Sequence, residues 1–230
     1  VSGNHEHYKT KENIDAGNKR ISSHADFFNS HSKRKFIFLN DDVFYVKHNG
    51  VNLRIVGGTL WTDFNFFYSS VKDAVYASLI INDYRFISGD QFPLLTTSVV
   101  NRRFDTTRET ISSVVSQPFD GPTIVVTHHI PSEKAINKRY KNIRSNIAFV
   151  SNLDDLVSKN VTLWCCGHTH SSSISRFDSG SLLVCNPAGI MNTKTGLREN
   201  QEFNPKLLID IRKDEKTNKW VASPINDVKV

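Results

Sequence analysis

The sequence contains little cysteine or methionine and has no long apolar run. Its 230 residues include three cysteines and one methionine. No segment approaches the roughly 18 consecutive apolar residues that a membrane-spanning helix needs, so we predict no membrane partner. The cysteines are odd in number and lie late in the chain, at Cys165, Cys166 and Cys185. They cannot form a disulfide framework, which predicts a reducing compartment and therefore a cytoplasmic protein.

Apolar and aromatic residues are plentiful, and the charge is basic. Hydrophobic residues make up 38% of the chain and aromatic residues 10%, a composition that excludes a disordered protein. The length suits one large domain better than two small ones. There are 29 Lys and Arg against 23 Asp and Glu, a formal net charge of +6. The dispersed positive charge permits contact with phosphate-bearing molecules, nucleic acid among them, without indicating nucleic acid.

Hydrophobic periodicity predicts alternating helices and strands, which is typical of an α/β fold. Two short runs, 123–127 and 161–166, are apolar on both faces and are separated by a helical pattern. We therefore expect them to be parallel strands inside a sheet. An Asn49-Gly50 turn predicts a hairpin between its flanking strands. The expected helices are 14–31, 69–82, 97–116 and 145–159, and the other expected strands are 36–39, 43–46, 51–56, 173–177, 181–185 and 206–212.

Three loops carry five of the nine histidines. They are Gly3-Asn4-His5-Glu6, Thr127-His128-His129 and Gly167-His168-Thr169-His170. Two of these loops follow the apolar strands, at the sheet edge where ligands bind in α/β proteins. Imidazole nitrogen and amide oxygen suit borderline divalent metals, so we expect the three loops to converge on a metal site. A structural zinc site at Cys165, Cys166, His168 and His170 is a weaker alternative, because adjacent cysteines do not easily reach one tetrahedral ion.

In this order, the three loops resemble three signature blocks of the calcineurin-like metallophosphoesterases. Val184-Cys185-Asn186-Pro187 and Asn204-Pro205 add to the resemblance, which spans the chain from residue 3 to about residue 211. It implies a four-layer αββα sandwich of two mixed sheets, formed by residues 1–230 as a single domain that lacks its first strands.

The resemblance also implies the site and the reaction. Asn4, His128 and His168 would bind one metal ion and His170 the other, with manganese, iron or zinc as the two divalent ions. The substrate would be a phosphomonoester or phosphodiester, attacked by a metal-bound hydroxide. His5 would contact the phosphate and assist the leaving group, a role that suits an imidazole because it titrates near neutral pH.

The sequence departs from this family pattern in one respect. The family has two earlier blocks, Asp-x-His and Gly-Asp-x-x-Asp, which supply carboxylate ligands; here Gly89-Asp90 follows the Asn4-His5 block. We expect the parent protein to have a preceding strand-helix-strand portion, since the sequence begins at Val1. The chain as given is then expected to be weakly active or inactive. The alternative function is a catalytically impaired binding module for a partner or nucleic acid.

A basic segment follows the His128-His129 loop. It contains few apolar residues and six that are basic or aromatic: Lys134, Lys138, Arg139, Tyr140, Lys141 and Arg144. We interpret it as a mobile loop near the site, and a lid over a phosphate substrate is one hypothesis for its role.

Overall fold

A computed structural model describes residues 1–67 and 70–225. Its helices are α1 (Ile14–His31), α2 (Ser70–Ile80), α3 (Asp83–Phe86), α4 (Thr97–Val115) and α5 (Asp154–Val157), with 3-10 turns η1 (His5–His7), η2 (Glu133–Ala135), η3 (Lys138–Tyr140) and η4 (Arg144–Ala148). Its strands are β1 (Asp42–His48), β2 (Val51–Gly58), β3 (Thr123–Thr127), β4 (Leu163–Cys166), β5 (Ser173–Arg176), β6 (Leu182–Cys185), β7 (Ile209–Lys213) and β8 (Trp220–Pro224). None of the described helices combines the length and the apolarity needed to cross a membrane.

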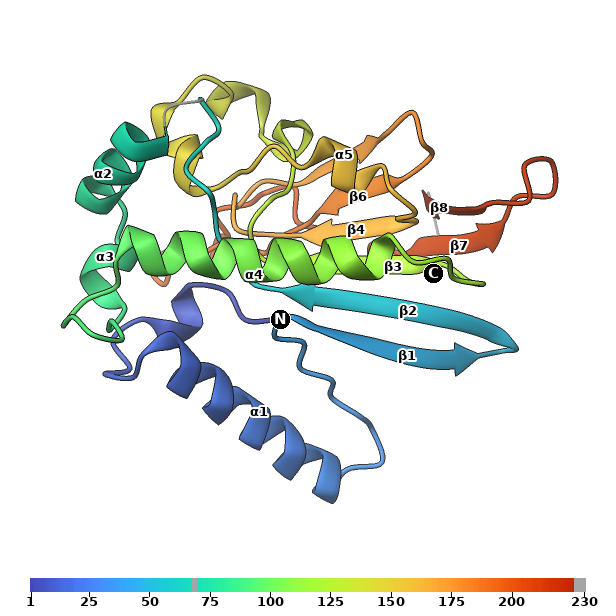
Figure 1. Cartoon of the computed structure of the whole chain (residues 1–230), viewed down its shortest axis with the longest axis horizontal. Coiled ribbons are helices and arrows are strands. Elements are labelled where there is room, and N and C mark those ends of the chain that lie inside the picture. Colours follow the sequence, from blue (N-terminus) through green and yellow to red (C-terminus); the bar gives the residue numbers. More distant parts are fainter. Residues whose placement is uncertain (68–69, 226–230) are drawn as a thin grey trace.

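Six strands form one mixed sheet in the order β1-β2-β3-β4-β6-β5 (Figure 1). The four central strands are parallel, while β1 and β5 run antiparallel at the two edges. The predicted parallel pairing of β3 and β4 is confirmed, with Val125 opposite Trp164. The hairpin through Asn49-Gly50 is also confirmed, and Gly50 has the positive φ of 83° that the turn requires.

The two faces of this sheet bury different apolar sets, because successive strand residues point to opposite sides. Trp164 belongs to the main core, which also contains Val100, Phe104 and Ile111 of α4. The long helix α4 lies along the sheet in Figure 1. Leu163 points the other way, into a smaller cluster beneath the β7–β8 hairpin. The sheet is thus an inner layer between helices and a second sheet.

The second sheet is smaller than the family resemblance implies. Among the described residues it consists of β7 and β8 alone, paired antiparallel. The expectation of two mixed sheets is therefore confirmed for the six-stranded sheet only, because the second sheet is a two-stranded antiparallel hairpin.

Two predicted elements are wrong. The expected strand 36–39 is a loop whose Phe36 and Ile37 are 52% and 43% exposed, so this apolar run has no strand partner. The expected helix 145–159 is replaced by η4, an extended segment and the four-residue α5. Val150 pairs with Ile130 in a parallel bridge, which a helical backbone cannot do. Helix 69–82 corresponds to α2, and Ser69 lies outside the described residues.

Candidate functional site

The candidate site lies where the parallel strands end. His128 directly follows β3, and His168 comes two residues after β4. The register pairs Val126 with Cys165, so the chain leaves both strands at the same level. The Gly167 N–H then donates a 3.0 Å hydrogen bond to the His128 carbonyl, which holds the two histidine loops together.

Three side chains from distant parts of the chain meet where β3 and β4 end. His128 Nε2 lies 3.0 Å from Asn4 Oδ1 and 3.0 Å from His168 Nδ1. Asn4 and His168 are 4% and 9% exposed, so the group is largely shielded from solvent. One amide oxygen and two imidazole nitrogens therefore face a common point.

Asp83 fixes the orientation of Asn4. The Asn4 amide Nδ2 donates to Asp83 Oδ1 at 2.7 Å, which turns its oxygen toward His128. The Tyr8 hydroxyl donates to the same carboxylate oxygen at 2.5 Å. Burial raises the pKa of Asp83, while the hydrogen bonds from Tyr8 and Asn4 act in the opposite direction. The sequence offered no motif around Asp83, so its role is visible only in the structure.

Burial holds two imidazoles of the site, those of His128 and His168, in the neutral form. Burial lowers the pKa of His128 to about 4; the Glu6 carboxylate partly offsets this, and the neighbouring His5 and His170 lower it further. Burial, followed by the nearby His129 and His128, takes the pKa of His168 well below its ordinary value. A neutral imidazole keeps a lone pair, which is the form that binds a metal ion.

Gly3 allows the chain to approach His128 closely. A β-carbon at Gly3 would lie 2.6 Å from His128 Cε1 and 3.0 Å from Glu6 Oε2. The Gly3 N–H donates to that Glu6 oxygen at 2.8 Å. By contrast, a β-carbon at Gly167 would meet nothing closer than 3.8 Å, so the second loop does not need its glycine for space.

The second histidine loop is strained at two positions. His168 has φ of 67° and His170 has φ of 49°, both in the left-handed region. Non-glycine residues rarely adopt this conformation, and such strain often marks a functional loop. The left-handed backbone directs the side chains of His168 and His170 differently from an extended backbone.

His5 and His170 line one cavity of about 450 Å³ together with Asn4 and His168. The His5 ring stacks on Tyr8 with the ring centroids 4.3 Å apart. His170 Nδ1 lies 2.7 Å from Glu199 Oε2. Glu199 was not identified from the sequence, since it is 29 residues from His170 and belongs to no motif.

The basic segment borders this cavity in part. Arg139 and Tyr140 are among the lining residues, and the Arg139 guanidinium packs on the Tyr140 ring, 4.4 Å from its centroid. Other basic side chains of the segment form ion pairs: Lys134 with Asp154, Lys141 with Glu133 and Arg144 with Asp73. The geometry thus brings one cation of the segment, Arg139, to the cavity.

The donor set can be compared with what a metal ion needs. Donor atoms bound to one ion at about 2.1 Å lie roughly 3 Å apart, which matches the separations around His128 Nε2. The three donors are neutral, and no group of three or more His, Cys, Asp or Glu that could hold a metal occurs within residues 1–67 and 70–225. Two of the three separations within Asn4, His128 and His168 thus have the length found between ligands of one ion, and the three side chains include no carboxylate that would balance a cation's charge.

The structure contradicts the alternative zinc site. Cys165 and Cys166 are neighbours in β4 and point to opposite faces of the sheet. Cys165 packs beneath the hairpin, and Cys166 packs against the main core. The two sulfurs therefore cannot bind one ion.

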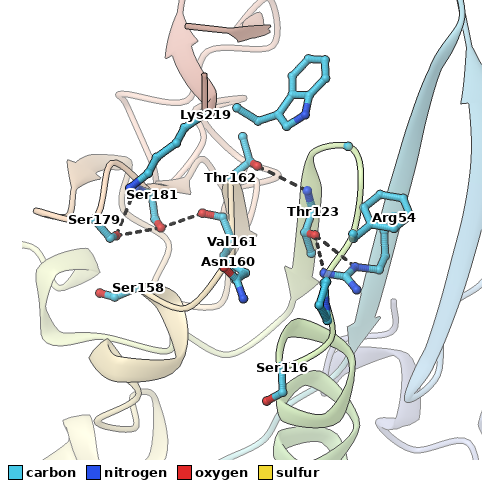
Figure 2. A pocket seen from close by; sticks show the side chains of 14 residues that line it. Arg54, Ser116, Thr123, Ser158, Asn160, Val161, Thr162, Ser179, Ser181 and Lys219 are labelled. Atoms are coloured by element: carbon cyan, nitrogen blue, oxygen red, sulfur yellow. Dashed lines mark hydrogen bonds between the residues drawn. The ribbon is translucent and has the colours of Figure 1, made fainter. Parts of the chain in front are cut away.

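A second cavity, of about 540 Å³, lies at the other end of the parallel strands, where β3 and β4 begin (Figure 2). It is lined by Thr123 at the start of β3 and by Thr162 just before β4. Arg54 donates to Thr123 Oγ1 from Nε at 3.1 Å and from Nη2 at 2.9 Å. Its lining contains no histidine, aspartate or glutamate, so it lacks the groups for metal binding or acid–base chemistry near neutral pH.

Comparison with known proteins gives a likeness in fold. No protein-family model and no curated protein matches the chain. The crystal structure of phosphopantetheinyl hydrolase from Mycobacterium tuberculosis matches with a TM-score of 0.55 and 14% identity, over 89% of this chain and 77% of that one. A candidate 5′-nucleotidase from Staphylococcus aureus gives a TM-score of 0.44 and 13% identity, over 98% of this chain and 37% of that one. The first match shows that this α/β fold is similar to that of a hydrolase.

Proposed function

We propose that this protein is a metal-dependent phosphoesterase. The observation that carries the proposal is the convergence of Asn4 Oδ1, His128 Nε2 and His168 Nδ1 beside a cavity that His5 and His170 also line. The fold likeness to a phosphopantetheinyl hydrolase supports the same class of protein. The proposal treats residues 1–230 as one phosphoesterase domain, with its two sheets as the inner layers of a four-layer sandwich.

Two cations would be held by the histidine loops. Asn4, His128 and His168 would hold the first, and His170 would contribute to the second. Glu199 accepts a hydrogen bond from His170 Nδ1 when that nitrogen carries the proton, which leaves Nε2 free to bind. Such cations, when bound, offset the negative charge of a phosphate ester and acidify water near it.

His5 would donate a proton to the leaving group. Its ring is exposed at the cavity and held against Tyr8, so a substrate seated on the histidine loops can reach it. The hydrogen bonds of Asp83 and Tyr8 go to the Asn4 amide and to each other, so His5 is held by ring stacking on Tyr8 and not by these hydrogen bonds. Cation binding and proton donation are therefore assigned to separate residues.

One observation favours a second function, a catalytically impaired binding module. The three converging donors include no carboxylate, and neutral ligands hold a dication less tightly than charged ones. A protein with weak cation affinity would keep the phosphate-binding cavity and lose turnover.

Hydrolysis of p-nitrophenyl phosphate and of bis(p-nitrophenyl) phosphate with added Mn²⁺ separates the two functions. We expect weak turnover by this chain, and we expect His128→Ala to lower it by about 100-fold, because the substitution removes the donor shared by both contacts at 3.0 Å. His24→Ala, at an exposed position of α1, is the matched control. His5→Gln should lower the rate more for an alkyl phosphate than for p-nitrophenyl phosphate, since a poor leaving group depends more on a proton donor. Full activity of His128→Ala would refute the ligand assignment, and an inactive wild type that binds inorganic phosphate but binds Mn²⁺ weakly would favour the binding module.

A further inference from the structure

The cavity that His5, His168 and His170 line also has exposed apolar side chains in its lining. Three isoleucines that line it are exposed to solvent: Ile80 by 38%, Ile143 by 44% and Ile190 by 54%. They come from the end of α2, from the segment between η3 and η4, and from the loop after β6. Exposed apolar side chains from three separate segments thus line one cavity, which is a common feature of a ligand-binding site.

The apolar wall continues down to the imidazoles. Phe149 lines the same cavity, and its ring packs against the His168 ring with centroids 4.4 Å apart. Ile136 and Ile81 also contribute to the lining. The lining therefore combines three imidazoles, of His5, His168 and His170, which we call the histidine floor, with this apolar set. It also contains polar side chains such as Asn137 and Arg139.

The volume exceeds what a phosphate group alone would fill. The cavity of about 450 Å³ lies in the range of roughly 300–1,000 Å³ typical of sites for organic ligands. A sugar or another polyhydroxyl group against the isoleucines would gain no hydrogen bonds from their side chains. An apolar group there would instead remove both its own surface and the three isoleucines from water.

We propose that the substrate is an amphiphilic phosphoester, with its phosphate on the histidine floor and an alkyl or aryl group between Ile80, Ile143 and Ile190. This inference rests on the proposed phosphoesterase function. The three isoleucines select the leaving group by binding its apolar part, and they take no part in making or breaking bonds.

The kinetic test uses a series of alkyl phosphates from propyl to hexyl, with glycerol phosphate as the polar comparison. The alkyl leaving groups have similar acidity, so differences in kcat/KM report binding of the chain. We expect kcat/KM to rise about fourfold per added methylene, the factor for burying one such group. Ile143→Ser and Ile190→Ser should flatten this dependence. Ile37→Ser, at a residue that is 43% exposed and outside the cavity lining, should leave it unchanged.

A binding test separates this inference from the function on which it rests. Hexylphosphonate and methylphosphonate cannot be hydrolysed, and calorimetry gives their affinities directly. Tighter binding of hexylphosphonate, lost in Ile143→Ser, supports the apolar subsite even when no ester is hydrolysed; in that case the proposed function fails, and the isoleucines remain the binding site for the apolar group of an amphiphilic phosphate ligand. Hydrolysis of propyl, hexyl and glycerol phosphates with equal kcat/KM would overturn the inference and leave the phosphoesterase function intact.

Discussion

Acid should destabilise the folded protein through His7, a buried histidine outside the proposed metal ligands. Its ring is 0% exposed, and neither ring nitrogen has a hydrogen-bond partner in the described part of the chain. Burial lowers the pKa of His7 from 6.5 to about 4; the Glu6 carboxylate raises it by a smaller amount, and the Arg103 guanidinium lowers it further. The folded protein therefore keeps this ring neutral at a pH where the unfolded chain binds a proton.

The sign and size of the effect follow from these two pKa values. Because the folded pKa is depressed, the stabilising contribution is complete above pH 6.5 and is lost as the pH falls toward 4. Between pH 7 and pH 5 the free energy of unfolding should fall by about 2 kcal/mol through His7 alone. That is a large share of the ~5–15 kcal/mol by which domains are stable.

Urea unfolding at pH 7, 6 and 5, with a chelator present, measures this loss. His7→Leu removes the titrating ring, so its free energy of unfolding should depend on pH less steeply than that of the wild type, by about 2 kcal/mol over this range. For each protein, the quantity compared is the change in the free energy of unfolding between pH 7 and pH 5. A different stability of His7→Leu at pH 7 therefore does not affect the comparison. His24→Gln, at an exposed position, should retain the wild-type pH dependence. The same pH dependence in His7→Leu and wild type would refute the reasoning.

Three further predictions concern the site and the core. Gly3→Ala should weaken Mn²⁺ binding at least tenfold, because the new methyl group displaces the ring 2.6 Å away, whereas Gly167→Ala should bind normally; equal affinities in calorimetry would contradict the role of Gly3. Asp83→Ala should weaken Mn²⁺ binding about tenfold by freeing the Asn4 amide, and unchanged affinity would show that Asn4 needs no support. Trp164→Ala should lower the free energy of unfolding by ~3–5 kcal/mol, because this side chain is 0% exposed; a loss below 1 kcal/mol in urea unfolding would contradict its place in the core.

Much of the sheet can be predicted from the sequence, because its central strands are apolar on both faces. The run at Thr123–Thr127 and the run ending at Cys166 could bury the apolar side chains of both faces only inside a covered sheet. The structure pairs the two runs in parallel. That pairing also places His128 beside the His168 loop. The juxtaposition therefore follows from strand pattern together with the position of each histidine.

The features that the sequence did not predict correctly also have specific causes. The apolar spacing in 145–159 matches a helix, yet the Val150 backbone pairs with Ile130, and this long-range pairing overrides the local pattern. Asp83 and Glu199 reach the site from segments without a recognisable pattern. Their contacts, to Asn4 at 2.7 Å and to His170 at 2.7 Å, depend on tertiary packing that no local spacing encodes.

Manganese titration followed by electron paramagnetic resonance tests the site most directly, because free and bound Mn²⁺ give different signals. We predict that the wild-type protein binds Mn²⁺ and that His128→Ala and His168→Ala each bind it at least tenfold more weakly. The exposed control His24→Ala should bind it as the wild type does. Equal Mn²⁺ affinity in the wild type and in His128→Ala would contradict the assignment of these donors to a metal centre.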